Sequence, residues 1–133
     1  MNSYKLLKSK MIDTNVILVD ITDIYIDENI KKYLIENDYN SFDKFSVISN
    51  SNTFPLNNDK IYKIKKGFKE DKFFLPISVS PPAKNKYIIL NGRHRLICSI
   101  LHGYTKIYIN IWKPSKRFLH RSKNPYIPPH KRK

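Results

Sequence analysis

Apolar and polar positions alternate along several segments of the chain, and a period of two is the pattern of a strand with one buried face. Residues 106–112 read Lys-Ile-Tyr-Ile-Asn-Ile-Trp, with the three isoleucines on one side, and the β-branched run at 16–26 begins in the same way. Residues 87–90 are a short continuous apolar run, which is typical of a buried strand. Extended backbone is expected at 73–80, because two prolines then end the segment. These segments predict the strands of a small sheet.

Three other segments carry apolar residues at steps of three and four, the spacing of a helix with one buried face. Residues 28–37 follow Asp27, whose side chain suits a helix N-cap. Residues 93–102 end at Gly103, where a left-handed C-cap is expected. Residues 58–68 also fit a helix, although their first half alternates like a strand. Together the elements predict an α/β (α+β) fold, a small mixed sheet with flanking helices.

The chain divides into one domain and a tail. Its 133 residues are enough for one core and too few for two. We assign the domain to 1–112, with an Asn- and Ser-rich insert near 38–58 that contains a short strand at 45–48. Residues 113–133 carry four prolines and eight Lys and Arg residues, so a flexible basic tail is expected.

The net charge of +14 is confined to the second half of the sequence. Residues 1–71 hold eleven lysines and eleven acidic residues, whereas 72–133 hold fourteen Lys and Arg residues and no acidic one. Such asymmetry is typical of proteins that attract polyanions, nucleic acid first; a basic face that is only solvated is the alternative. Aromatic side chains in and before the tail can stack on bases. The candidate nucleic-acid contacts are Lys113, Lys116, Arg117, Arg121, Lys123, Lys131, Arg132 and Lys133.

The cysteine content and the lengths of the apolar runs exclude disulfides, cysteine-rich zinc sites and membrane spans. Cys98 is the only cysteine, so an internal disulfide and a cysteine-rich zinc site are excluded, and we predict no metal site. No apolar run approaches the roughly 20 residues of a membrane span, and the first ten residues lack a signal-type apolar core. We therefore expect a soluble, intracellular protein without a membrane partner. Its oligomeric state is left open.

The most specific motif is a turn between a predicted strand and a predicted helix. A helix start exposes unpaired backbone N–H groups and the positive end of its dipole, and a glycine lets an anion approach the backbone. Arginines can hold phosphate oxygens with a planar fork, and a histidine can donate a further hydrogen bond. The alternative is an ordinary turn with solvated arginines. The predicted phosphate- or nucleotide-binding residues are Asn91, Gly92, Arg93, His94 and Arg95.

In its order of motifs the sequence resembles the ParB/sulfiredoxin superfamily, in which a Pro-Ile-x-Val strand precedes a second strand, a Gly-x-x-Arg turn, a helix and a further strand. The corresponding segments are LPISV, KYIILNGRHRLICSILHGY and TKIYINIW, and VILVDITDIYI is similar to the first strand of the family. The resemblance covers most of 16–34 and 59–112. It implies a ParB/sulfiredoxin-like fold whose turn binds nucleotide phosphates: ATP in sulfiredoxins and free-serine kinases, CTP in ParB proteins. The implied cofactor is ATP or CTP with Mg²⁺.

By the same resemblance, Gly92 matches the glycine of the turn, and His94 with Arg95 matches the His-Arg pair of the sulfiredoxin turn. Arg93 stands where sulfiredoxins have their catalytic cysteine, so sulfiredoxin chemistry is excluded. Cys98 lies inside the predicted helix, and we expect it to be buried there.

A kinase, an NTPase or a nuclease needs carboxylates for magnesium or for a general base. None follows Asp71, so the carboxylates must come from Asp20, Asp23, Asp27, Glu28, Glu70 or Asp71. The related kinases have an acidic residue near the position of Glu70 and Asp71. We therefore name Glu70, Asp71 and His94 as the candidate catalytic residues. Carboxylates that are only exposed at a helix end are the alternative.

The leading hypothesis is a nucleic-acid-binding protein whose turn at 91–95 binds a nucleotide or a backbone phosphate. A nucleotide-dependent enzyme, either a small-molecule kinase or a ParB-like nuclease or NTPase, is the alternative. A third hypothesis is an accessory protein whose basic tail docks onto a nucleoprotein while the turn is vestigial. The expected partners are thus nucleic acid and a nucleotide.

Overall fold

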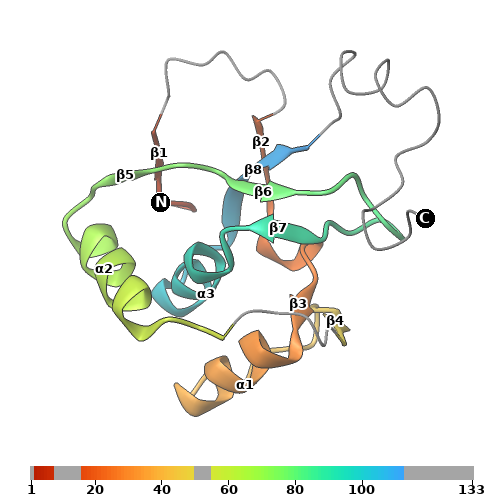
Figure 1. Cartoon of the computed structure of the whole chain (residues 1–133), viewed down its shortest axis with the longest axis horizontal. Helices are drawn as coiled ribbons and strands as arrows, with labels where there is room; N and C mark the ends of the chain where they lie inside the picture. Colours follow the sequence, from red (N-terminus) through yellow and green to blue (C-terminus); the bar gives the residue numbers. More distant parts are fainter. Residues whose placement is uncertain (1, 8–15, 50–54, 113–133) are drawn as a thin grey trace, which may run out of the picture.

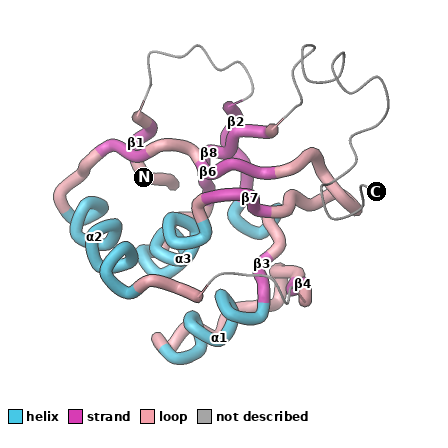
Figure 2. The backbone as a smooth tube through the Cα atoms, viewed as in Figure 1, coloured by secondary structure: helices cyan, strands magenta, loops and turns pink. Residues whose placement is uncertain are grey.

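The computed structural model describes residues 2–7, 16–49 and 55–112, and the predicted tail lies outside them. No helix in these ranges is long and apolar enough to cross a membrane. Figure 1 and Figure 2 show the three α-helices below the main sheet. The elements are β1 (Lys5–Leu6), β2 (Val16–Asp20), the 3-10 turn η1 (Ile21–Asp23), β3 (Ile26–Asp27), α1 (Glu28–Glu36), β4 (Val47–Ile48), α2 (Asn58–Lys69), β5 (Phe73–Phe74), β6 (Ile77–Val79), β7 (Ile89–Asn91), α3 (Arg93–His102) and β8 (Lys106–Ile111).

The main sheet has four strands in the order β2-β8-β6-β7 and is mixed, as the sequence predicted. β8 lies inside the sheet, antiparallel to β2 and parallel to β6, and the alternation along β8 buries Ile107 and Ile109 completely. Because β6 and β8 are parallel, the chain between them must cross over, and this crossover contains β7, the turn at Gly92 and α3. The topology of the sheet therefore fixes where the turn lies.

The core lies between this sheet and the helices. Leu96 and Ile97 of α3 belong to the same buried cluster as Ile77 and Val79 of β6. The three predicted helices are confirmed, and so are their predicted ends at Asp27, which caps α1, and at a left-handed glycine after α3. Helix prevails over alternation in α2 because its apolar residues at helical spacing reach the core from one face.

The prediction of one strand over 16–26 is wrong beyond Asp20. The chain leaves the sheet there, forms η1, and continues as β3, which pairs with β4 instead. Ile21 and Ile24 explain the break, because both are buried although their odd separation would put them on opposite faces of a strand. The short strand predicted at 45–48 is confirmed as β4, so the described part of the insert is tied to the core.

The prediction of a buried strand at 87–90 is also wrong. The strand is β7, which begins at Ile89 and lies at the edge of the sheet with β6 as its neighbour. Leu90 is 54% exposed. A continuous apolar run indicates burial on both faces only where both faces are covered, and the edge position leaves this run half open.

Candidate functional site

The turn between β7 and α3 depends on a glycine for reasons of backbone and packing. Gly92 has a φ of 111°, in the left-handed region, and α3 begins at the next residue. A Cβ at this position would lie 2.5 Å from Cγ2 of Ile77 on β6. The turn therefore packs directly on the sheet, and the α3 start has no side-chain N-cap. The first backbone N–H groups of a helix have no partner within the helix itself.

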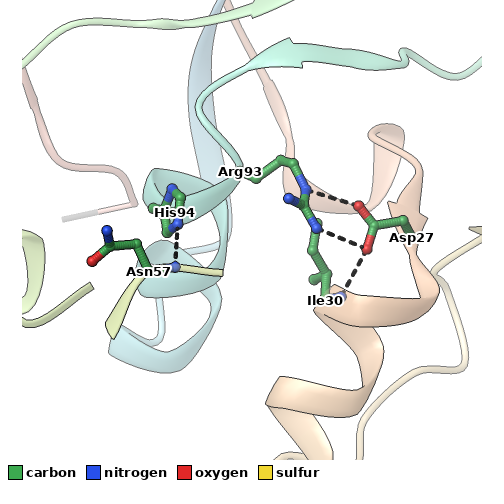
Figure 3. Close-up of polar contacts among 5 residues, drawn as sticks. All are labelled: Asp27, Ile30, Asn57, Arg93 and His94. Atoms are coloured by element: carbon green, nitrogen blue, oxygen red, sulfur yellow. Dashed lines mark hydrogen bonds and ion pairs between the residues drawn. The ribbon is translucent and has the colours of Figure 1, made fainter. Parts of the chain in front are cut away.

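Arg93 turns away from the other side chains of the turn and toward α1. Its Nε lies 2.9 Å from Oδ2 of Asp27, and a second guanidinium nitrogen lies 3.2 Å from Oδ1. The two side chains are 16% and 8% exposed, so this ion pair is largely buried. The same Oδ1 accepts the N–H of Ile30 and so caps α1. Figure 3 shows this bridge on one side of the α3 start, with His94 on the other.

Arg95 holds the two residues between β5 and β6. Its guanidinium donates to the carbonyl oxygens of Leu75 at 2.9 Å and Pro76 at 3.1 Å. The two arginines of the predicted site thus have internal partners, and neither is simply solvated.

His94 points toward the start of α2. Its Nε2 accepts a hydrogen bond of 2.9 Å from the backbone N–H of Asn57, the N-cap residue of α2 (Figure 3). An accepting Nε2 requires the neutral ring with its proton on Nδ1. Burial, followed by the positive charges of Lys60, Arg93 and Arg95, lowers the pKa of His94 below its usual value. The region around the α3 start is therefore electrically positive even with this histidine neutral.

α2 and α3 run parallel, with their N-termini at the same end. Asn57 and His94 are bonded at their starts, and the rings of Phe68 and His102 lie 5.7 Å apart near their ends. The positive ends of two helix dipoles consequently meet beside the turn. The α2 start is capped by the side chain of Asn57 and carries Asp59 in its first turn, so the uncapped start of α3 is the stronger anion site of the two.

A cavity of about 330 Å³ opens at this junction of α2 and α3. Its lining combines cations, an amide and a glycine, and it contains no carboxylate among the described residues. Magnesium prefers oxygen ligands such as carboxylates, so these side chains fit an anion and do not fit a metal ion of their own. The lining residues are Lys60, Lys63, Ile64, Asn91, Gly92, His94 and Arg95.

The predicted catalytic carboxylates lie at the other end of the helix pair. Glu70 follows the last residue of α2 and pairs with Lys72 at 3.5 Å. Asp71 adopts a left-handed φ of 56°. The pKa of Tyr104, just beyond α3, is raised first by burial and second by the negative charge of Asp71. Because α2 has 12 residues, this end lies about 18 Å from its start. Glu70 and Asp71 are not brought together with His94.

Two lysines of the cavity, Lys60 and Lys63, were missed by the sequence analysis. Nothing in a single sequence places α2 beside the Gly92 turn, because the two segments are separated by about 30 residues and three strands. The carboxylate that does reach the turn is Asp27, as the partner of Arg93. Cys98 is buried as predicted, and burial raises the pKa of its thiol to about 12. The predicted nucleic-acid contacts in 113–133 lie outside the described residues.

No protein-family model and no curated protein sequence matches this chain. Among solved structures, it is similar to sulfiredoxin from Arabidopsis thaliana, with 16% identity and a TM-score of 0.45 over 82% of this chain and 97% of that one. It is also similar to the C-terminally truncated chromosome-partitioning protein ParB from Caulobacter crescentus complexed with CTP-gamma-S, with 12% identity and a TM-score of 0.48. The match covers 84% of this chain and 55% of that ParB chain. Sulfiredoxin and ParB give their names to the superfamily that the motifs resemble, and the likeness concerns the fold alone.

Proposed function

We propose that this protein binds the phosphate groups of a nucleotide in the cavity at the start of α2 and α3. The observation that carries the proposal is the meeting of the uncapped α3 start with Lys60, Lys63 and Arg95 around one opening that has no carboxylate in its described lining. Helix starts and lysines are general phosphate-binding groups, and a cavity lined by cations without a carboxylate is expected to hold an anion.

The groups that line the cavity are placed to contact different phosphates of one nucleotide. The helix start of α3, which has no side-chain cap, suits one phosphate, and Lys60 and Lys63 can neutralise further phosphates of the same nucleotide. Magnesium, where it accompanies a nucleotide, would be held by the phosphate oxygens, since these lining residues offer it no carboxylate. ATP and CTP are the nucleotides that the sequence resemblance implies, so both are the ligands to titrate.

Calorimetric titration of ATP and CTP, with and without magnesium, tests the proposal. The informative variant is Lys60→Ala/Lys63→Ala, because both side chains are exposed and line the cavity, whereas Arg93 and Arg95 also hold the fold. Loss of the two charges should weaken binding by at least about tenfold, the equivalent of roughly 1.4 kcal/mol.

The matched control is Lys66→Ala/Lys69→Ala, which removes the same charge from the same helix outside the cavity. This control should bind a nucleotide like the wild type. If neither nucleotide bound to the wild type, or if both double variants weakened binding equally, the nucleotide site would be rejected.

Nucleic-acid binding is a second candidate, favoured by the distribution of charge. All of the net charge of +14 falls within 72–133, and no acidic residue occurs there. We propose that a domain at 1–112 is followed by a tail whose cations contact nucleic-acid phosphates. Binding of this kind weakens steeply with salt, because association releases counterions. Undetectable binding of DNA and RNA at low salt would exclude it.

A further inference from the structure

Four lysines of α2 follow one another at steps of three residues, and because each step falls about 60° short of a full turn they wind obliquely across the exposed side of the helix. Lys60, Lys63, Lys66 and Lys69 are three residues apart, and all four are exposed. At 1.5 Å per residue the row extends about 14 Å along the helix axis. This row, called the lysine row below, lies in the half of the sequence whose total charge is zero, so that composition alone conceals it.

No carboxylate pairs with the lysine row in the described part of the chain, although Asp59 lies on the same helix, four residues before Lys63. None of its four ammonium groups takes part in an ion pair there, and Glu70, the acidic residue that follows α2, pairs with Lys72. Like charges three and four residues apart destabilise a helix, and mixed charges would keep this surface soluble without that cost. The charge is therefore complementary to a polyanion.

The lysine row begins at the cavity and leads away from it along α2. Lys60 and Lys63 line the cavity at the α3 start, whereas Lys66 and Lys69 lie beyond it. A single nucleotide in the cavity reaches only the first two. An oligonucleotide that places one phosphate in the cavity can contact Lys66 and Lys69 with its following phosphates.

Tyr62 lies between these lysines and is 67% exposed. Among residues 2–7, 16–49 and 55–112, no stacked ring or cation contacts its aromatic face. An exposed tyrosine alone requires no explanation. Beside a row of cations, however, it completes the combination by which proteins bind single strands, namely phosphate contacts with an aromatic ring on which a base stacks.

We propose that the lysine row and Tyr62 form a binding surface for single-stranded nucleic acid, which begins at the Gly92 cavity and runs along α2. The proposal rests on the second candidate function for its class of partner, but it assigns contacts to the folded domain and not to the tail. Duplex nucleic acid and anionic lipid are the competing partners that the test must separate.

The test measures binding of a fluorescently labelled oligothymidine to the full chain across a series of salt concentrations. Lys66→Ala/Lys69→Ala should weaken binding by about tenfold at low salt and reduce the slope of log affinity against log salt by about 1.4, for two lost contacts to a single strand. The matched control Lys32→Ala/Lys44→Ala removes two exposed lysines from α1 and the segment after it. Its affinity for the oligothymidine should fall by less than that of Lys66→Ala/Lys69→Ala. Tyr62→Ala should weaken single-strand binding by about fivefold or more while duplex binding is unchanged.

Equal losses in the two double variants would overturn the proposal, because any two positive charges would then serve. So would a Tyr62→Ala variant that binds like the wild type, or lysine-row variants that lose vesicle binding and keep oligonucleotide binding. Failure of this proposal can be distinguished from failure of the nucleotide site, because Lys66→Ala/Lys69→Ala retains every residue that lines the cavity. Nucleotide affinity and oligonucleotide affinity are therefore measured separately on the same variant. Circular dichroism establishes that each variant is folded.

Discussion

The two sides of the Gly92 turn carry the same sign of charge and use it differently. On the side of α1, the guanidinium of Arg93 is buried against Asp27. On the side of α2, Lys60 and Lys63 are exposed around a cavity without a carboxylate in its described lining. The first side is a clamp that ties the turn to the capped start of α1, and the second is an open positive surface.

This difference shows that charge near a helix start does not by itself identify a ligand contact. A buried cation needs a partner, and Arg93 has one within the fold; an exposed cation is free to meet a ligand. The arginines of the turn attract attention in the sequence, whereas the lysines that are accessible lie on another helix. Substitutions around the turn and at the far end of α2 test whether the two sides are separable.

Gly92→Ala should have the largest effect, because it disturbs both sides. The positive φ and a Cβ placed 2.5 Å from Ile77 predict a loss of about 4 kcal/mol in the free energy of unfolding. Urea denaturation measures it. Gly103→Ala is the matched control: its φ of 95° is also left-handed, but nothing lies within 4 Å of the added Cβ. It should cost about 1–2 kcal/mol from backbone strain alone. Equal losses would mean that the contact with Ile77 contributes nothing.

Arg93→Ala should break the clamp at a cost of about 3 kcal/mol, since Asp27 would stay buried without its cation. Asp27→Ala should cost at least as much, because it also removes the cap of α1. In a double-mutant cycle the two losses should not add. If Arg93→Ala left the stability unchanged and abolished nucleotide binding, Arg93 would belong to the open side.

His94 predicts a smaller, pH-dependent effect on the open side. Its folded-state pKa is lowered by burial and by neighbouring cations, so below the ordinary value of 6.5 the unfolded chain takes up the proton more readily. Stability from the neutral ring is therefore complete above pH 6.5 and is lost as the pH falls from there to the lowered pKa. A phosphate beside the ring favours the protonated form, so nucleotide affinity should rise over the same window.

Thermal unfolding and nucleotide titration between about pH 7.5 and 5.5 check both trends. His94→Gln keeps a side chain that can accept the N–H of Asn57 but does not titrate. Its profiles should lack the contribution of His94. Profiles identical to those of the wild type would assign the pH dependence to other groups.

Glu70→Gln/Asp71→Asn should have the smallest effect on binding. These carboxylates lie at the end of α2 far from the cavity, so nucleotide affinity should stay within about twofold of the wild type. Asparagine suits the left-handed backbone at position 71. A loss of more than about tenfold, or of any nucleotide turnover, would return both residues to the functional site and reject the cavity as its centre.

The sequence predicted most elements and the turn, and it failed where burial depended on neighbours. The alternation at 106–112 and the caps of α1 and α3 are local signals, which the structure confirms. The run at 87–90 was predicted to be buried because an apolar sequence does not show whether the strand has a neighbour on each side or lies at the edge of the sheet. Similarly, 16–26 could not reveal where the chain leaves the sheet.

By itself the sequence determined the helix boundaries, the alternating central strand and the need for a glycine between β7 and α3, because these depend on propensity, capping and backbone angles within a few residues. Only the tertiary structure decided that Arg93 pairs with Asp27, 66 positions away, and that α2 brings Lys60 and Lys63 to the turn. Which cation is buried and which is exposed follows from how distant segments pack, since desolvation and pairing are properties of a neighbourhood that the chain creates only when it folds.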